Sequence, residues 1–217
     1  MWNYEKRLQY PINIKNCNPT LAAMIISQYG GPDGELGASM RYLSQRYSMP
    51  YREVAGLLTD IGTEELGHLE MVSTMVHQLT RNLTMDEIKA SGFAPYYTDH
   101  TVGIWPQSAG GIPFNSCEFQ SKGDPITDMF ESMAAEQKAR STYDNILRVV
   151  RDIPEIADPI RFLRAREVVH FQRFGEAKRE DCSKKSTVLK AHKYSTFGKI
   201  LSIRKTQDVG ISRPICC

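Results

Sequence analysis

Residues 62–68 read Gly-Thr-Glu-Glu-Leu-Gly-His and contain a Glu-x-x-His pair, formed by Glu65 and His68. A second pair of the same kind, Glu167 and His170, follows about a hundred residues later in the chain. Residues three positions apart on a helix lie on one face, so the two side chains of each pair can reach the same ion. The chain therefore carries two candidate metal-binding helices.

An upstream glutamate accompanies each pair. Glu35 precedes Glu65 by 30 positions, and Glu136 precedes Glu167 by 31 positions. Two copies of a glutamate followed by Glu-x-x-His, all on helical segments, are typical of a dinuclear carboxylate metal site inside a four-helix bundle. The sequence thus predicts an all-α four-helix bundle with Glu35, Glu65, His68, Glu136, Glu167 and His170 in its interior.

Both pairs lie on apolar faces of their predicted helices. The first face consists of residues spaced by three and four: Leu58, Ile61, Glu65, His68, Val72, Met75 and Leu79. The second face has the same spacing: Ile160, Leu163, Glu167, His170, Phe174 and Ala177. Such spacing marks the inward face of a packed helix. One such pair alone is more often a solvated glutamate beside a core histidine. Four interior carboxylates, in contrast, need compensating cations, because an unpartnered buried carboxylate costs several kcal/mol.

Length and composition narrow the class of protein. The 217 residues suffice for one domain with a sizeable core, and the net charge of +2 points to neither nucleic acid nor an anionic membrane as partner. No apolar run approaches the roughly 20 residues of a membrane span. The first residues lack the layout of a signal peptide, so we expect synthesis in the cytoplasm. The five cysteines form no C-x-x-C pair and are expected to be reduced, with Cys216 and Cys217 as a reactive end.

The order of the predicted helices follows from breaks in the apolar pattern. We expect an interrupted first helix from about Leu21 to Tyr47, and helices at about 49–79, 125–151 and from 155 or 159 to 180. A capping box at Thr84 and Glu87 predicts a further short helix. The Gly- and Pro-rich segment 91–125 predicts a long irregular crossover between the second and third bundle helices. Residues 1–180 would form the bundle, and 181–217 a polar tail that is extended or partly disordered.

Tyrosines and further glutamates lie near the predicted site. Tyr42 follows Glu35 by seven positions, and Tyr143 follows Glu136 by seven, which is two helical turns. A tyrosine so placed can donate a hydrogen bond to a ligating carboxylate. We favour this role for Tyr42, whereas Tyr143 is equally well explained as a core aromatic residue. Glu64 and Glu70 lie off the apolar face, so we expect both to be solvated, and we expect His77 to be a surface or packing residue.

The residues quoted so far resemble those of the manganese catalases. The similarity is carried by residues 57–75 (LLTDIGTEELGHLEMVSTM), by 40–45 (MRYLSQ) and by 164–170 (RAREVVH), and it spans about residues 5–180. Within that family the chain is most similar to the short members found in the coats of bacterial endospores. The resemblance implies a ferritin-like bundle that holds two manganese ions and dismutates hydrogen peroxide to water and dioxygen. It also implies a homo-oligomer, a hexamer in this family, and a location in the spore coat, where other coat proteins are possible partners.

Roles for the site residues are carried over from this resemblance. Glu65 is expected to bridge both ions. Glu35 and His68 would complete the coordination of one ion, and Glu136 and His170 that of the other. Glu167 resembles an outer-sphere carboxylate that handles protons, although di-iron relatives use the same position as a direct ligand. Together with Tyr42, Glu167 is a candidate catalytic residue.

The chain departs from the family pattern at two places, and two other functions remain open. Ala135 stands where some members carry an arginine that shields the site, and the tail after Asp181 matches no family feature. Carboxylate and imidazole ligands suit iron as well as manganese, so a di-iron ferroxidase or peroxidase is the first alternative. A mainly structural spore-coat protein is the second.

Overall fold

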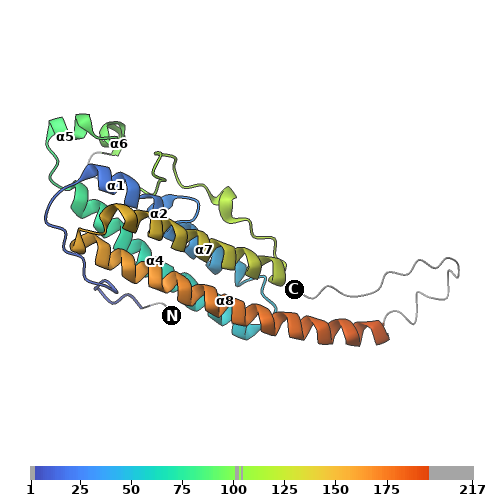
Figure 1. The fold of residues 1–217 in the computed structure, drawn as a ribbon. Coiled ribbons are helices and arrows are strands. Elements are labelled where there is room, and N and C mark those ends of the chain that lie inside the picture. The colour runs from blue at the N-terminus through green and yellow to red at the C-terminus, as the bar shows by residue number, and fades with distance from the viewer. Residues whose placement is uncertain (1–2, 101–102, 104, 196–217) are drawn as a thin grey trace.

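The computed structural model describes residues 3–100, 103 and 105–195. Four helical segments form the bundle: α3 (Glu35–Gln45), α4 (Arg52–Thr80), α7 (Pro125–Val150) and α8 (Pro154–Ser195). Helix α3 packs on α4, α7 packs on α8, and the two pairs lie side by side along the long axis of the molecule (Figure 1). The predicted ferritin-like helical bundle is confirmed.

The first predicted helix is interrupted, as expected. It consists of α1 (Pro19–Ile25) and α2 (Ser27–Gly30), followed by α3. The side chain of Asn18 caps α1 by accepting a hydrogen bond from the backbone N–H of Leu21, with Pro19 in the first turn. The glycine-rich segment 30–34 then interrupts the helix, and Glu35 begins α3 with Gly34 as its N-cap.

The long crossover between α4 and α7 is confirmed, with more helix than the sequence predicts. The capping box at Thr84 and Glu87 opens α5 (Met85–Ala90). A further helix, α6 (Ala94–His100), and a 3₁₀ turn, η1 (Ser116–Phe119), lie in the segment that composition alone predicts to be irregular. Helices α5 and α6 lie together at one end of the bundle, beyond α1 (Figure 1).

The predicted end of the fourth helix at residue 180 is wrong, because α8 continues to Ser195. The apolar period stops near residue 180, but residues 176–195 contain neither glycine nor proline and are rich in Lys, Glu, Arg and Ala. Such residues sustain backbone helix without a buried face. In Figure 1 the last part of α8 projects past the other bundle helices. The division into bundle and tail stays a prediction, and 196–217, with Cys216 and Cys217, lie outside the described residues.

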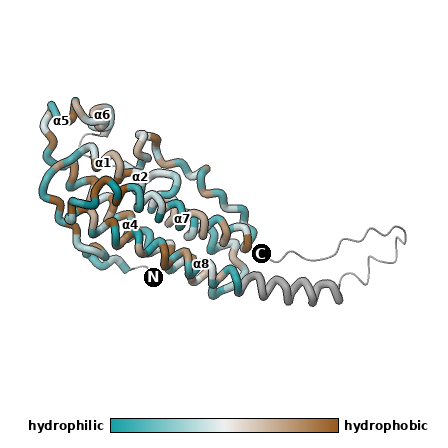
Figure 2. Tube along the Cα trace, viewed as in Figure 1, coloured by the Kyte–Doolittle hydropathy of each residue, from teal (hydrophilic) through white to brown (hydrophobic). Residues whose placement is uncertain are grey.

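Two apolar clusters of the core lie on either side of the site residues. Along α4, Val54, Leu58 and Ile61 belong to one cluster, while residues from Met71 to Leu79 belong to the other. Helices α7 and α8 likewise contribute residues to both clusters. Figure 2 shows hydrophobic and hydrophilic residues alternating along the bundle helices. The polar site is therefore closed at both ends by close-packed apolar side chains.

Close contact between α3 and α4 positions the site. A Cβ added at Gly62 would lie only 2.9 Å from Cγ of Leu43, so the lack of a side chain there lets the two helices approach. The Ser39 hydroxyl donates a hydrogen bond of 2.8 Å to the Gly62 carbonyl oxygen at the same crossing.

Among the described residues, none of the helices combines the length and the apolar character needed to cross a bilayer.

Candidate metal centre

Six chemically active side chains from four helices meet in the interior of the bundle. Glu35 is the first residue of α3, α4 supplies Glu65 and His68, α7 supplies Glu136, and α8 supplies Glu167 and His170. Every one of the six is at most 2 % exposed. The convergence that the sequence predicts is therefore present, although these residues come from positions up to 135 residues apart in the chain.

The six residues form two overlapping groups. One group consists of Glu35, Glu65, His68 and Glu167, and the other of Glu65, Glu136, Glu167 and His170. Within each group, one potential ligand atom from every residue lies within 4.8 Å of the others. Two groups that share residues provide two neighbouring cation positions, as a dinuclear centre requires.

Glu65 lies between the two histidines. Its Oε2 atom is 2.7 Å from Nδ1 of His68, and its Oε1 atom is 2.7 Å from Nδ1 of His170. The first contact is a hydrogen bond, whereas Glu65 Oε1 and His170 Nδ1 form none with each other or with any other described residue. Glu65 therefore places one carboxylate oxygen against each of the two imidazole rings.

The site contains further buried polar atoms without a hydrogen bond. They are Glu136 Oε2, Glu167 Oε1, His68 Nε2 and His170 Nε2. Buried polar atoms in proteins are nearly always partnered, so a concentration of exceptions at one place needs an explanation. Carboxylate oxygens and one imidazole for each position suit divalent manganese or iron. The residues therefore fit a pair of such ions.

The electrostatics of the site reflect its burial. Burial and the charge of Glu65 raise the pKa of Glu35 to about 7, against an opposing effect of His68. Burial and the charges of Glu136, Glu35 and Glu65 raise the pKa of Glu167 well above its ordinary value. Both carboxyl groups therefore bind protons more readily than exposed ones, and cations would compete with those protons, because metal ligands bind in their deprotonated forms.

For Glu65 and His170, the charges of neighbouring residues outweigh the effect of burial on the pKa. Burial alone would raise the pKa of Glu65, but His170 and His68 hold it below its ordinary value. Burial alone would lower the pKa of His170, but the Glu65 carboxylate beside it raises that pKa to about 12. Glu65 is thus the most strongly ionised carboxylate of the six-residue cluster, which suits a residue that faces both cation positions.

Tyr42 and Tyr143 each form a hydrogen bond to a glutamate in the other helix pair of the bundle. The Tyr42 hydroxyl, on α3, donates a hydrogen bond to Oε1 of Glu136 on α7. The Tyr143 hydroxyl, on α7, donates to Oε1 of Glu35 on α3. Each tyrosine thus orients the glutamate of the other helix, so Tyr143 is more than the ordinary core aromatic residue that the sequence left as an equal alternative. Two turns of helix place each hydroxyl at the level of the site, and only the packing of α3 against α7 decides its partner.

Replacement of Tyr42 by phenylalanine is expected to weaken metal retention while keeping the fold. The ring of Tyr42 packs on Phe174 at a centroid distance of 4.9 Å, and phenylalanine keeps that contact. Loss of the hydroxyl frees the Glu136 carboxylate to rotate, and loss of an orienting partner typically costs about 10–100-fold in affinity or activity. Metal content after gel filtration, beside a circular dichroism spectrum, measures both effects. Tyr143→Phe is the matched variant at Glu35, and unchanged metal content in both would contradict this role.

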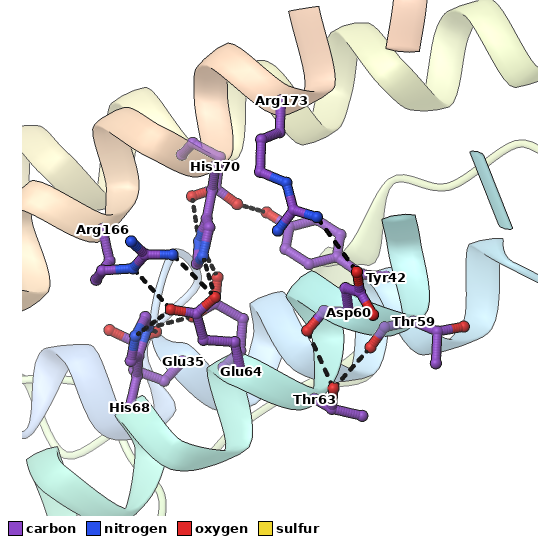
Figure 3. Close-up of polar contacts among 12 residues, drawn as sticks. Glu35, Tyr42, Thr59, Asp60, Thr63, Glu64, His68, Arg166, His170 and Arg173 are labelled. Carbon is purple, nitrogen blue, oxygen red and sulfur yellow. Dashed lines mark hydrogen bonds and ion pairs between the residues drawn. The ribbon is translucent and has the colours of Figure 1, made fainter. Parts of the chain in front are cut away.

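The prediction that Glu64 is solvated is wrong. Its side chain is 19 % exposed, and it accepts hydrogen bonds from Arg166 Nε (2.7 Å) and Nη2 (3.1 Å). It also lies 3.2 Å from Nε2 of His170 and 3.6 Å from Nε2 of His68 (Figure 3). Burial alone would raise the pKa of Glu64, but His170, His68 and Arg166 hold it far below its ordinary value.

A signal for this contact was present in the sequence. Glu64 directly precedes Glu65, and Arg166 directly precedes Glu167, so each Glu-x-x-His pair carries a charge of opposite sign at the same offset. Equivalent positions on helices that pack together can face each other across the contact. Glu64 lies off the apolar face of its own helix, and its partner Arg166 comes from the facing helix α8.

The remaining candidates lie where the sequence suggests. His77 is exposed, and Ala135 is buried. Glu70 lies apart from the site and accepts a 2.5 Å hydrogen bond from the Tyr4 hydroxyl of the N-terminal segment. Cys17 and Cys117 are free thiols.

Comparison with known proteins places this geometry in one family. Residues 1–207 match the family described as manganese containing catalase. The chain is 51 % identical over 177 residues to Protein CotJC from Bacillus subtilis (strain 168), covering 82 % of this chain and 93 % of that protein. It is 31 % identical over 179 residues to a probable manganese catalase from Clostridium acetobutylicum, covering 82 % and 79 % of the two chains.

A solved structure has the same fold. The crystal structure of KatB, a manganese catalase from Anabaena, superposes with a TM-score of 0.77 at 26 % sequence identity, covering 98 % of this chain and 88 % of that one. The matched family, the relatives and the shared bundle agree with the buried ligand set. The chain belongs to the manganese-containing catalase family.

Proposed function

We propose that this protein is a dimanganese catalase that dismutates hydrogen peroxide to water and dioxygen. The observation that carries the proposal is the pair of overlapping buried groups that share Glu65 and Glu167. Glu35, Glu65 and His68 would hold one manganese ion, and Glu65, Glu136 and His170 the other. Membership in the family supports manganese as the metal.

The reaction joins two opposite half-reactions. A bound manganese pair would supply the exchange of two electrons with hydrogen peroxide. In one half-reaction, peroxide takes up two electrons and two protons, its O–O bond breaks, and water forms. In the other, a second peroxide gives up two electrons and two protons and leaves as dioxygen. The protein must therefore accept protons in one half and return them in the other.

Glu167 is the group best placed for this proton exchange. It belongs to both ligand groups, its Oε1 atom forms no hydrogen bond within the described part of the chain, and its pKa is raised by burial and by the neighbouring carboxylates. A buried carboxyl group with a raised pKa can hold a proton near neutral pH and release it again. We assign Glu167 as the acid–base residue.

Elemental analysis and an oxygen electrode on one preparation test the proposal. Bound manganese with catalytic release of dioxygen from hydrogen peroxide is the expected result. The ligand types also suit iron, so bound iron with oxidation of ferrous ion and no dioxygen release would instead establish the ferroxidase alternative. Protein with neither metal nor turnover would be a structural component, and the proposal would then be wrong.

Removal of the metal is expected to lower the melting temperature by about 5–10 °C. A ligand at about 100 times its dissociation constant stabilises a protein by about 2.7 kcal/mol, and each kcal/mol shifts the melting temperature of a chain this size by about 2–4 °C. Differential scanning calorimetry before and after dialysis against a chelator measures the shift. Addition of manganese must restore it, and equal restoration by calcium would speak against an electron-transferring site.

We also propose a homo-oligomer, a hexamer as the family resemblance implies, with a place in the spore coat. Similarity to Protein CotJC over 82 % of the chain supports membership among the short coat-type proteins. Large apolar side chains on the surface, such as Tyr47 (80 % exposed) and Ile112 (65 % exposed), are available for subunit contacts. Light scattering coupled to gel filtration measures the number of subunits, and immunolabelling of spores of the source bacterium tests the location.

A further inference from the structure

The imidazole rings of His68 and His170 lie between two carboxylates. The rings are stacked, with centroids 5.6 Å apart and planes 22° from parallel. The Nδ1 edges of both rings face Glu65 at 2.7 Å, on the inner side. The Nε2 edges face Glu64, which lies 3.6 Å from His68 and 3.2 Å from His170 (Figure 3). Two consecutive glutamates of α4 therefore lie at the two opposite edges of both rings.

Glu64 is held in this position from the facing helix. Arg166, on α8, donates one hydrogen bond to each of its carboxylate oxygens, at 2.7 and 3.1 Å. A two-point contact between a guanidinium group and a carboxylate fixes the plane of the carboxylate as well as its distance. The 19 % and 29 % exposure of the two side chains places the pair at the boundary between the core and the surface.

A cavity of about 980 Å³ lies on the outer side of this pair. Glu64 and Arg166 line it together with Glu70 on α4 and Tyr4 in the N-terminal segment. The two histidines are fully buried and do not line the cavity. The Glu64–Arg166 pair therefore separates this cavity from the Nε2 edges of both rings.

We propose that Glu64 is a positioning residue, one carboxylate that accepts the Nε2–H of both histidines so that each presents Nδ1 to the metal. This inference rests on the proposed function. Histidines that bind metals almost always donate their other ring N–H to a carboxylate, carbonyl or water, which fixes both tautomer and orientation. Both Nε2 atoms are buried and form no hydrogen bond within the described residues. Glu64 faces both of them, because the rings stack closely enough to share one acceptor.

The arrangement also links the two halves of the centre. His68 belongs to the first ligand group and His170 to the second, and they come from α4 and α8. A single carboxylate that orients both rings sets their relative geometry, and Arg166 connects that carboxylate to α8. A change at Glu64 is therefore expected to affect both metal positions together rather than one.

Glu64→Gln tests the proposal through metal affinity. Glutamine keeps the shape of the side chain but removes the charge, and its amide group can no longer accept from both rings. The manganese affinity of the variant, measured by competition with a chelator, is expected to fall about 10–100-fold at both positions, with a changed manganese EPR spectrum. Glu70→Gln is the matched control, because it removes a carboxylate from the same cavity and the same helix without touching either ring.

Different outcomes separate the two proposals. If the unmodified protein binds no manganese, the proposed function itself fails. If it binds manganese and Glu64→Gln binds equally tightly with the same EPR spectrum, only the positioning role is overturned. A merely structural residue would lower the melting temperature of the metal-free protein while leaving the affinity of the folded protein unchanged. Arg166→Met decides the question if Glu64→Gln does not fold: weaker manganese binding supports the positioning role, and unchanged affinity contradicts it.

Discussion

Glu65→Gln is expected to remove manganese from both positions and to reduce dioxygen release below detection. Glu65 belongs to both ligand groups, and its two oxygen atoms each face a different histidine at 2.7 Å. Its pKa is held below the ordinary value by those histidines, so it supplies a full negative charge where the cations would lie. Removal of a residue that only orients a ligand typically costs about 10–100-fold in metal affinity, and we expect a larger loss of affinity in Glu65→Gln.

Metal analysis and peroxide turnover on the same sample measure this effect. Glu70→Gln again serves as control, because it changes a glutamate of the same helix whose carboxylate accepts a hydrogen bond from the N-terminal Tyr4 and lies apart from the six-residue cluster. Breaking a buried charge cluster at one member costs about 3–5 kcal/mol, so circular dichroism must first show that the variant is folded. A folded Glu65→Gln protein with two manganese ions would place the metals elsewhere.

Glu167→Gln is expected to keep both manganese ions and to lose about 10²- to 10⁴-fold in kcat, the usual contribution of a positioned acid–base group. The substitution preserves the shape of the side chain in a fully buried position and removes only its ability to carry a proton. Because the change affects proton exchange rather than ligation, KM should change little. Glu176→Gln, at an exposed position of the same helix, should turn over peroxide as the parent does.

Steady-state kinetics with metal analysis distinguish the two roles open to Glu167. Retained manganese with low kcat supports an outer-sphere proton carrier. Loss of one equivalent of manganese would make Glu167 a direct ligand, as in di-iron relatives. Full turnover would remove it from the mechanism altogether.

Much of the site was predictable because its chemistry is local in sequence. The i, i+3 spacing of each Glu-x-x-His pair places both side chains on one helix face, and the apolar residues around them show that this face points inward. The bundle and the six-residue cluster follow from these periods, and the crossover follows from the glycine and proline content of residues 91–125. The end of α8 does not, because residues 176–195 contain neither glycine nor proline, and helix propensity continues the helix where the apolar period stops.

Contacts across helices could not be read from periods. The sequence places Tyr42 and Tyr143 near the site but does not pair Tyr42 with Glu136 or Tyr143 with Glu35. Glu64 lies off the apolar face of its own helix, and only the position of Arg166 on α8 shows that it is held against both histidines.

The sequence by itself determined the fold class and the meeting of the six side chains in the interior of the bundle, because helical spacing is a short-range property of the chain. The tertiary structure alone decided which tyrosine orients which glutamate. It also placed the Glu64 carboxylate against two imidazole rings. Those partners depend on the relative rotation and height of neighbouring helices, which are set by the packing of side chains far apart in the sequence.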